Sequence, residues 1–172
     1  MTIRVQEADF DFGAEIAALR LGHPRVGAVV GFVGAVRDLN DGAAVELLEL
    51  EHYPGMTERA LEQIVERARA RWVLADVTVI HRVGPLAPTD QIVMVAVASA
   101  HRGNAFAACE FIMDYLKTEA PFWKKEGAGD AHRWVDARVS DAQARARWGD
   151  AAALPEERLA GKKAGEKPAS EK

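Results

Sequence analysis

The fold is decided by residues 99–126, which read SAHRGNAFAACEFIMDYLKTEAPFWKKE. Between Gly103 and Lys117, apolar residues recur at spacings of three and four, which is typical of a helix with one buried face. The recurring residues are Phe106, Cys109, Ile112, Met113 and Leu116. The sequence therefore predicts a core helix over residues 103–117, with positive charges before and after it.

Local signals mark both ends of this helix. Asn104 can act as the N-cap, and Pro121 disfavours helical backbone at the residue before it, so we expect the helix to end near Thr118. His101 and Arg102 precede the helix at a strand-to-helix junction, a kind of position that often binds anions. The first end of the helix is therefore a candidate anion site.

Lysines follow the helix at its other end. Lys117 lies in the last turn, where the helix dipole alone favours a positive charge. Lys124 follows across residues 121–123, which we expect to form a rigid aromatic loop. The helix dipole explains Lys117 but not Lys124, so the presence of both lysines indicates a binding role.

The composition is that of an ordinary globular protein. The chain has 172 residues, 49% of them hydrophobic and 28% charged, which is enough for one domain with a real core. Its net charge of −4 argues against a nucleic-acid partner, because binding phosphates requires a basic surface. We expect one domain over residues 1–149 and a disordered tail over residues 150–172, since residues 161–172 contain no large apolar side chain.

The cysteine content and the hydropathy of the chain limit the cellular compartments in which we expect it. Cys109 is the only cysteine, so no internal disulfide can form, and its place on the apolar stripe favours an inert core thiol over a nucleophile. No apolar run reaches the roughly 18 residues that a membrane helix needs, and the N-terminus has no secretory signal. We therefore expect no membrane partner and a cytoplasmic protein.

The remaining elements form a mixed order without regular βαβ repeats, which favours an α+β fold. We expect a buried strand at 26–33, half-exposed strands at 45–53 and 77–83, and an apolar strand at 92–98. Short strands are expected near 3–5 and 133–139. Asp11, Thr57 and Ser140 are the candidate caps of helices that end near residues 21, 72 and 148.

Standard catalytic motifs are missing. The sequence has no Walker A loop, GxGxxG, HExxH or CxxC pattern, and its five histidines lack ligand spacing, so we expect no metal. What remains is a set of cations that mostly flank apolar elements: Arg37, His101, Arg102, Lys117, Lys124, Lys125 and Arg138. In an acidic protein, this arrangement suggests a pocket for an anionic small molecule or a carboxylate tail. For Arg37 alone, an exposed ion pair with Asp38 is an equally simple explanation.

Five segments, in one order and with family-like spacing, resemble the catalytic (large) subunit of molybdopterin synthase. They are GAVR (34–37), EHYPGM (51–56), VIHRVG (79–84), SAHR (99–102) and MDYLK through APFWKKE (113–126). The resemblance runs from about residue 27 to residue 148. Each motif alone is weak, but their combination is specific.

The resemblance implies an α/β-hammerhead fold with a mostly antiparallel sheet, a homodimer, and a heterotetramer with two small ubiquitin-like carriers. Each carrier would insert its Gly-Gly thiocarboxylate into the active site. Sulfur would pass to cyclic pyranopterin monophosphate, and two such transfers would form the dithiolene of molybdopterin with no cofactor or metal. By the same resemblance, Lys117 and Lys124 are catalytic. The implied substrate-binding residues are Ala35, Val36, Arg37, His101, Arg102, Lys125, Glu126 and Arg138. Ala35 stands where some relatives carry lysine, so a side-chain role there is not expected.

Helix geometry adds a further expectation. Arg102 and Lys117 lie about 22 Å apart along one straight helix, at about 1.5 Å per residue, beyond the joint reach of their side chains. One protomer therefore cannot offer both residues to one substrate. We predict a composite site, in which His101 and Arg102 of one protomer reach the pocket that contains Lys117 of the other.

Two other classes of function stay open at this point. The chain could be a non-catalytic adaptor for a ubiquitin-like protein, in which case carrier binding would survive loss of both lysines. It could instead be an unrelated anion-binding enzyme, such as an acyl or phosphoryl transferase, although the missing phosphate loop and metal motif disfavour this.

Overall fold

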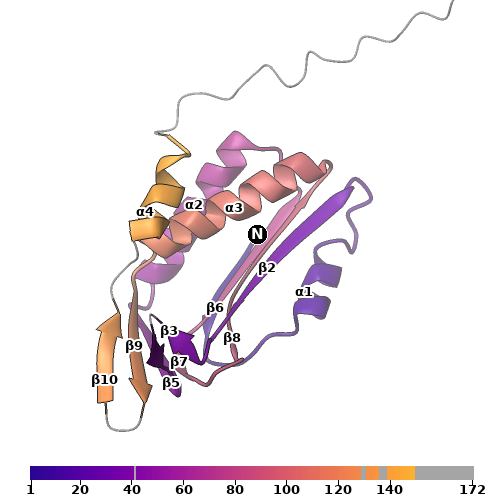
Figure 1. Cartoon of the computed structure of the whole chain (residues 1–172). Coiled ribbons are helices and arrows are strands. Elements are labelled where there is room, and N and C mark those ends of the chain that lie inside the picture. Colours follow the sequence, from indigo (N-terminus) through magenta and orange to yellow (C-terminus); the bar gives the residue numbers. More distant parts are fainter. Residues whose placement is uncertain (41, 129–130, 136–138, 150–172) are drawn as a thin grey trace, which may run out of the picture.

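The computed structural model describes residues 1–40, 42–128, 131–135 and 139–149. Its larger sheet has the order β1-β6-β8-β2 (Figure 1). These strands are β1 (Thr2–Gln6), β6 (Asp76–Arg82), β8 (Gln91–Ser99) and β2 (Ala28–Ala35). Only β1 and β6 run parallel within this sheet, and the other neighbours are antiparallel.

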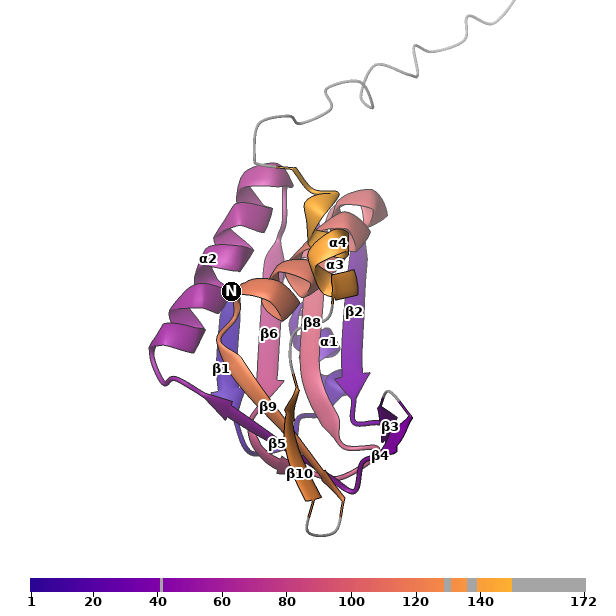
Figure 2. The ribbon, with the colours of Figure 1, turned by 60° about the vertical axis from the view of Figure 1, so that its left-hand side comes forward.

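A second sheet crosses one end of the first, as Figure 2 shows. Its order is β10-β9-β5-β7, all antiparallel. These strands are β10 (Ala131–Val135), β9 (Phe122–Ala128), β5 (Leu47–His52) and β7 (Gly84–Leu86). A short hairpin, β3 (Leu39–Asn40) and β4 (Ala43–Ala44), follows β2. The α+β class with mostly antiparallel pairing is therefore confirmed.

Helices cover both faces of the larger sheet. Helices α2 (Met56–Arg71) and α3 (Arg102–Glu119) pack on one face, and α1 (Phe12–Ala18) lies on the other (Figure 1). Helix α4 (Val139–Ala146) packs against α3. In the described part of the chain, no helix is both long and apolar enough to cross a membrane.

Strands β6 and β8 are buried on both sides because helices cover both faces of the sheet, and successive side chains of a strand point to opposite faces. Val79 and Val95 face α2 and α3, whereas Ile80 and Met94 face the α1 side. The expectation of a half-exposed strand at 77–83 was therefore wrong, because residues 77–81 are all buried. The expectation of a buried strand at 26–33 was also wrong in part, because β2 is an edge strand of mixed exposure.

Helix α3 is the expected core helix with two corrections. Cys109, Ile112 and Leu116 are buried, but Phe106 is 61% exposed on the side of the helix over the edge strand β2. The helix begins at Arg102 with His101 in the N-cap position, so Asn104 lies inside the first turn and was wrongly assigned as the cap.

Two more capping assignments were wrong and one was confirmed. Asp11 caps α1 by accepting a hydrogen bond from the Ala14 backbone N–H. Gly55, with φ of 80°, is the N-cap of α2, and Thr57 is buried inside the first turn. Ser140 does not cap α4, because that helix already begins at the preceding residue.

Residues 121–123 were expected to form a loop, but Phe122 begins the strand β9. This strand pairs with β5, with Leu48 opposite Glu126 and Leu50 opposite Lys124. The correction matters for function, because the lysines after α3 lie on a paired strand with a fixed register. The expected tail at 150–172 lies outside the described residues.

Candidate functional site

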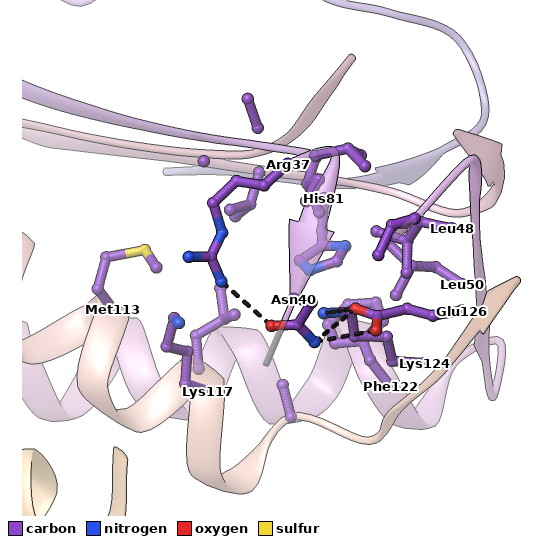
Figure 3. Close-up of a pocket in the computed structure, with 18 of the residues that line it drawn as sticks. Arg37, Asn40, Leu48, Leu50, His81, Met113, Lys117, Phe122, Lys124 and Glu126 are labelled. Carbon is purple, nitrogen blue, oxygen red and sulfur yellow. Dashed lines mark hydrogen bonds and ion pairs between the residues drawn. The ribbon is translucent and has the colours of Figure 1, made fainter. Parts of the chain in front are cut away.

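A cavity of about 300 Å³ lies where the two sheets meet the C-terminal half of α3 (Figure 3). Its floor is apolar and includes Leu48 and Leu50 of β5, with Met113 and Leu116 of α3. Its polar lining residues come from several elements: Arg37 after β2, Asn40 of β3, His81 of β6, Lys117 of α3, and Lys124 and Glu126 of β9. The fold therefore brings together charged groups that are far apart in sequence.

Strand alternation decides which β9 residues face the cavity. Phe122, Lys124 and Glu126 line it, because every second side chain of a strand points to the same side. Lys125 belongs to the opposite side and forms an ion pair of 3.8 Å with Glu49, its cross-strand neighbour on β5. The register of β9 therefore places Lys124 in the cavity and the adjacent Lys125 on the opposite side of the sheet.

A chain of polar contacts runs along one wall of the cavity (Figure 3). Arg37 donates from Nη2 to Oδ1 of Asn40 at 3.2 Å, and Asn40 donates from Nδ2 to both oxygens of Glu126 at 2.9 Å each. Glu126 in turn lies 2.6 Å from Nζ of Lys124. Arg37, for which an ion pair with Asp38 was an alternative, therefore binds an uncharged amide.

Lys117 is held more loosely than Lys124. It lies in the last turn of α3, with its side chain 50% exposed and its Nζ 3.9 Å from a carboxylate oxygen of Asp141. It also borders a second, more open hollow beside Phe32 and Phe106. Its ammonium group can therefore move between the two spaces at little energetic cost.

His81 supplies a neutral aromatic wall. Its ring stacks on Phe122 with centroids 3.7 Å apart, and Nδ1 lies 2.8 Å from the backbone oxygen of Arg82. Burial lowers the pKa of His81 to about 4, because the charged imidazolium would lose its hydration. Since the carbonyl oxygen only accepts, Nδ1 carries the proton of the neutral ring.

Cys109 is an inert thiol, as expected from the sequence. It is 4% exposed, and its Sγ lies 3.6 Å from the backbone oxygen of Val95. Burial raises the pKa of Cys109 to about 12, so the reactive thiolate is scarce at neutral pH. Among the described residues, no three His, Cys, Asp or Glu side chains are grouped closely enough to hold a metal ion.

The structure brings together six of the residues that the sequence marked for a site: Ala35, Val36, Arg37, Lys117, Lys124 and Glu126. His101 and Arg102 are exposed at the far end of α3, and Lys125 faces away, so these three do not line the cavity of their own protomer. Arg138 lies outside the described residues.

Among the polar residues in the described lining of the cavity, sequence reasoning missed two, Asn40 and His81. Asn40 stands in the turn-forming stretch 38–42, where asparagine is common for local reasons. His81 stands in an alternating strand, where it looked like an ordinary buried residue. Only their positions in the fold distinguish them.

Three cations, Arg37, Lys117 and Lys124, converge on a small, partly apolar cavity, an arrangement that suits anionic groups. Residues 5–119 match the family model described as MoaE protein, and the chain belongs to this family. The family resemblance inferred from the sequence is thereby confirmed.

Three relatives illustrate the similarity. The chain is 71% identical over 148 residues to the molybdopterin synthase catalytic subunit of Ralstonia nicotianae, covering 86% of this chain and 84% of the relative. The structure of the molybdopterin biosynthesis MoaE protein from Burkholderia ambifaria is 62% identical, with a TM-score of 0.75 over 87% of this chain and 98% of that one. The structure of molybdopterin synthase from Staphylococcus aureus is 32% identical, with a TM-score of 0.71 over 77% of this chain and 95% of that one.

Proposed function

We propose that this chain is the catalytic subunit of molybdopterin synthase, with residues 1–149 as its catalytic domain. It takes sulfur from the C-terminal thiocarboxylate of a small ubiquitin-like carrier and transfers it to cyclic pyranopterin monophosphate, and two such transfers form the dithiolene of molybdopterin. The observation that carries this proposal is the cavity, in which Arg37, Lys117 and Lys124 converge in a member of the MoaE family. A cytoplasmic location is part of the proposal, in keeping with a single cysteine and no internal disulfide.

The charges of the cavity fit two anionic reactants. The donor ends in a thiocarboxylate and the acceptor carries a cyclic phosphate, so the two would repel each other without positive groups between them. Arg37, Lys117 and Lys124 supply these groups, against the one carboxylate of Glu126 among the described lining residues. The apolar floor suits the pterin ring and the narrow Gly-Gly tail.

The different environments of the two lysines suggest different roles. Lys117, exposed and loosely paired with Asp141, can follow the thiocarboxylate and protonate a leaving oxygen. Lys124 is held in place by Glu126 and can stabilise charge that develops on the pterin side chain or its phosphate. A fixed cation stabilises charge best at a defined position, whereas a mobile one suits an incoming peptide tail.

We further propose that the site is shared between two protomers. Arg102 and Lys117 lie near opposite ends of α3, about 22 Å apart at about 1.5 Å per residue. His101 and Arg102 would therefore serve the cavity of the partner in a homodimer, and two carriers would complete a heterotetramer.

Mixed dimers test this sharing. An Arg102→Ala chain combined with a Lys117→Ala chain should rebuild one working site per mixed dimer, although each variant alone should react slowly. If mixed dimers are isolated and show no recovery, the composite site is wrong.

Reconstitution tests the function itself. The full chain is incubated with thiocarboxylated carrier and the cyclic pterin, and dithiolene product is followed in a single turnover. Lys117→Ala and Lys124→Ala should each slow product formation by about a hundredfold or more, as loss of a transition-state cation does. Arg59→Ala, at an exposed position of α2, is the control and should react like wild type.

Two outcomes would contradict the proposal. Full activity in both lysine variants would show that sulfur transfer does not take place in this cavity. Carrier binding without any product, in wild type as well as in the variants, would instead make the chain a non-catalytic adaptor.

A further inference from the structure

Asn40 occupies an unusual place between opposite charges. It is buried at 3% exposure and joins the guanidinium of Arg37 to the carboxylate of Glu126, which is buried at 4%. Its amide orientation follows from chemistry, because only the oxygen can accept from Arg37 and only the NH₂ group can donate to Glu126. Asn40 lies outside the five sequence segments that resemble the family.

We propose that Asn40 is a positioning residue that keeps Arg37 from forming an ion pair with Glu126. This inference rests on the proposed function, because it concerns the same cavity. The amide holds the guanidinium by a neutral oxygen, so the positive charge of Arg37 stays available for the phosphate of the pterin. At the same time, the amide N–H group steadies the Glu126 carboxylate that lies against Lys124.

The physical reason is the strength of the alternative contact. Arginine and carboxylate form bidentate, charge-assisted hydrogen bonds that are about twice as strong as neutral ones. A direct contact between Arg37 and Glu126 would neutralise the cation and close that wall of the cavity. An asparagine is long enough to span the two groups and carries no charge of its own, so it separates them without competing for the substrate.

A conservative substitution separates this role from simple packing. Asn40→Asp keeps the shape of the side chain but places a carboxylate beside Arg37, which would pair with it. The KM for the cyclic pterin should rise about tenfold to a hundredfold at pH 8, the range expected for loss of one hydrogen bond to a charged group. The KM for the carrier should stay within about threefold of wild type, because that substrate meets Lys117.

The division between KM and kcat gives a second readout that a packing defect would not move. In Asn40→Asp, the new carboxylate lies beside Glu126 but also close to the cations Arg37 and Lys124, which favour its charged form. It therefore acts by pairing with Arg37, which weakens binding of the pterin and leaves both lysines in place. The kcat at saturating pterin should stay within about threefold of wild type.

The experiment is steady-state sulfur transfer for wild type, Asn40→Asp and Asn40→Ala, with the pterin varied at saturating carrier and then the carrier varied at saturating pterin. Gln63→Glu is the matched control, because it makes the same amide-to-carboxylate change at an exposed site on α2. An unchanged pterin KM in Asn40→Asp, or a kcat that falls as far as the pterin KM rises, would overturn the inference alone. A wild-type chain that forms no product would defeat the proposed function and this inference with it.

Discussion

Acid should destabilise this protein through His81, and a substitution can isolate the effect. The folded protein holds the pKa of His81 at about 4, against 6.5 for the free side chain, because burial excludes the charged form. The unfolded chain therefore binds more protons between pH 6.5 and about 4, and lowering the pH through this window favours unfolding. The stability that His81 contributes as a neutral ring is present above pH 6.5 and is lost below it.

The size of the effect follows from this difference in pKa. One pKa unit corresponds to about 1.4 kcal/mol, so the full shift is on the order of 3 kcal/mol, of which about 2 kcal/mol is reached at pH 5. His81→Asn removes the titrating ring and keeps a polar group near the Arg82 carbonyl. We expect this variant to be less stable than wild type at pH 7 but to lose about 2 kcal/mol less between pH 7 and pH 5.

Urea unfolding at pH 7 and pH 5 measures this difference, with the protein concentration held constant because association would shift the midpoint. Val79→Ala is the control, since it removes a buried side chain two residues away without removing a titrating group. The free energy of unfolding that Val79→Ala loses relative to wild type should be the same at pH 7 and pH 5. If wild type and His81→Asn lose equal stability between pH 7 and pH 5, the neutral, buried state of His81 is refuted.

Two further predictions concern single residues outside the charged wall. Thr57 donates to the Pro121 backbone oxygen at 3.2 Å and accepts from the Tyr53 N–H at 3.3 Å, so Thr57→Val should cost about 1–3 kcal/mol in urea unfolding by leaving these part-buried backbone groups without their partner. A loss below about 0.5 kcal/mol would show that these hydrogen bonds are unimportant for stability. Cys109, buried and with its pKa raised to about 12, should react with a thiol reagent only when the protein opens. Labelling of the native protein as fast as that of a small free thiol would contradict this.

Local patterns predicted the parts of the fold that depend on local physics. Helix periodicity located α3 and the inner face of α2, and the carboxylate of Asp11 located the start of α1. The strand β9 could not be predicted in this way, because it is defined by pairing with β5, about 70 residues earlier in the chain. A Pro-Phe-Trp sequence without that partner looks like a loop.

The same distinction explains the site. Lysines and arginines beside apolar elements could be recognised from sequence, and the family motifs indicated which of them are catalytic and which bind substrate. Asn40 and His81 could not, because their significance lies in the neighbours that the tertiary fold gives them: two opposite charges for Asn40 and the Phe122 ring for His81. For Arg102 and Lys117, sequence alone was sufficient, because the expected length of one helix already placed them too far apart to contact one substrate.

The central claim is that the cavity beside Lys117 and Lys124 receives the carrier tail. The most direct measurement is a crystal structure of this chain in complex with its carrier. We expect the carrier's last two glycines to enter the cavity, with the terminal carboxylate within about 4 Å of the Nζ of Lys117 or Lys124, the usual limit for an ion pair. A well-ordered carrier whose C-terminus lies outside this cavity would contradict the account.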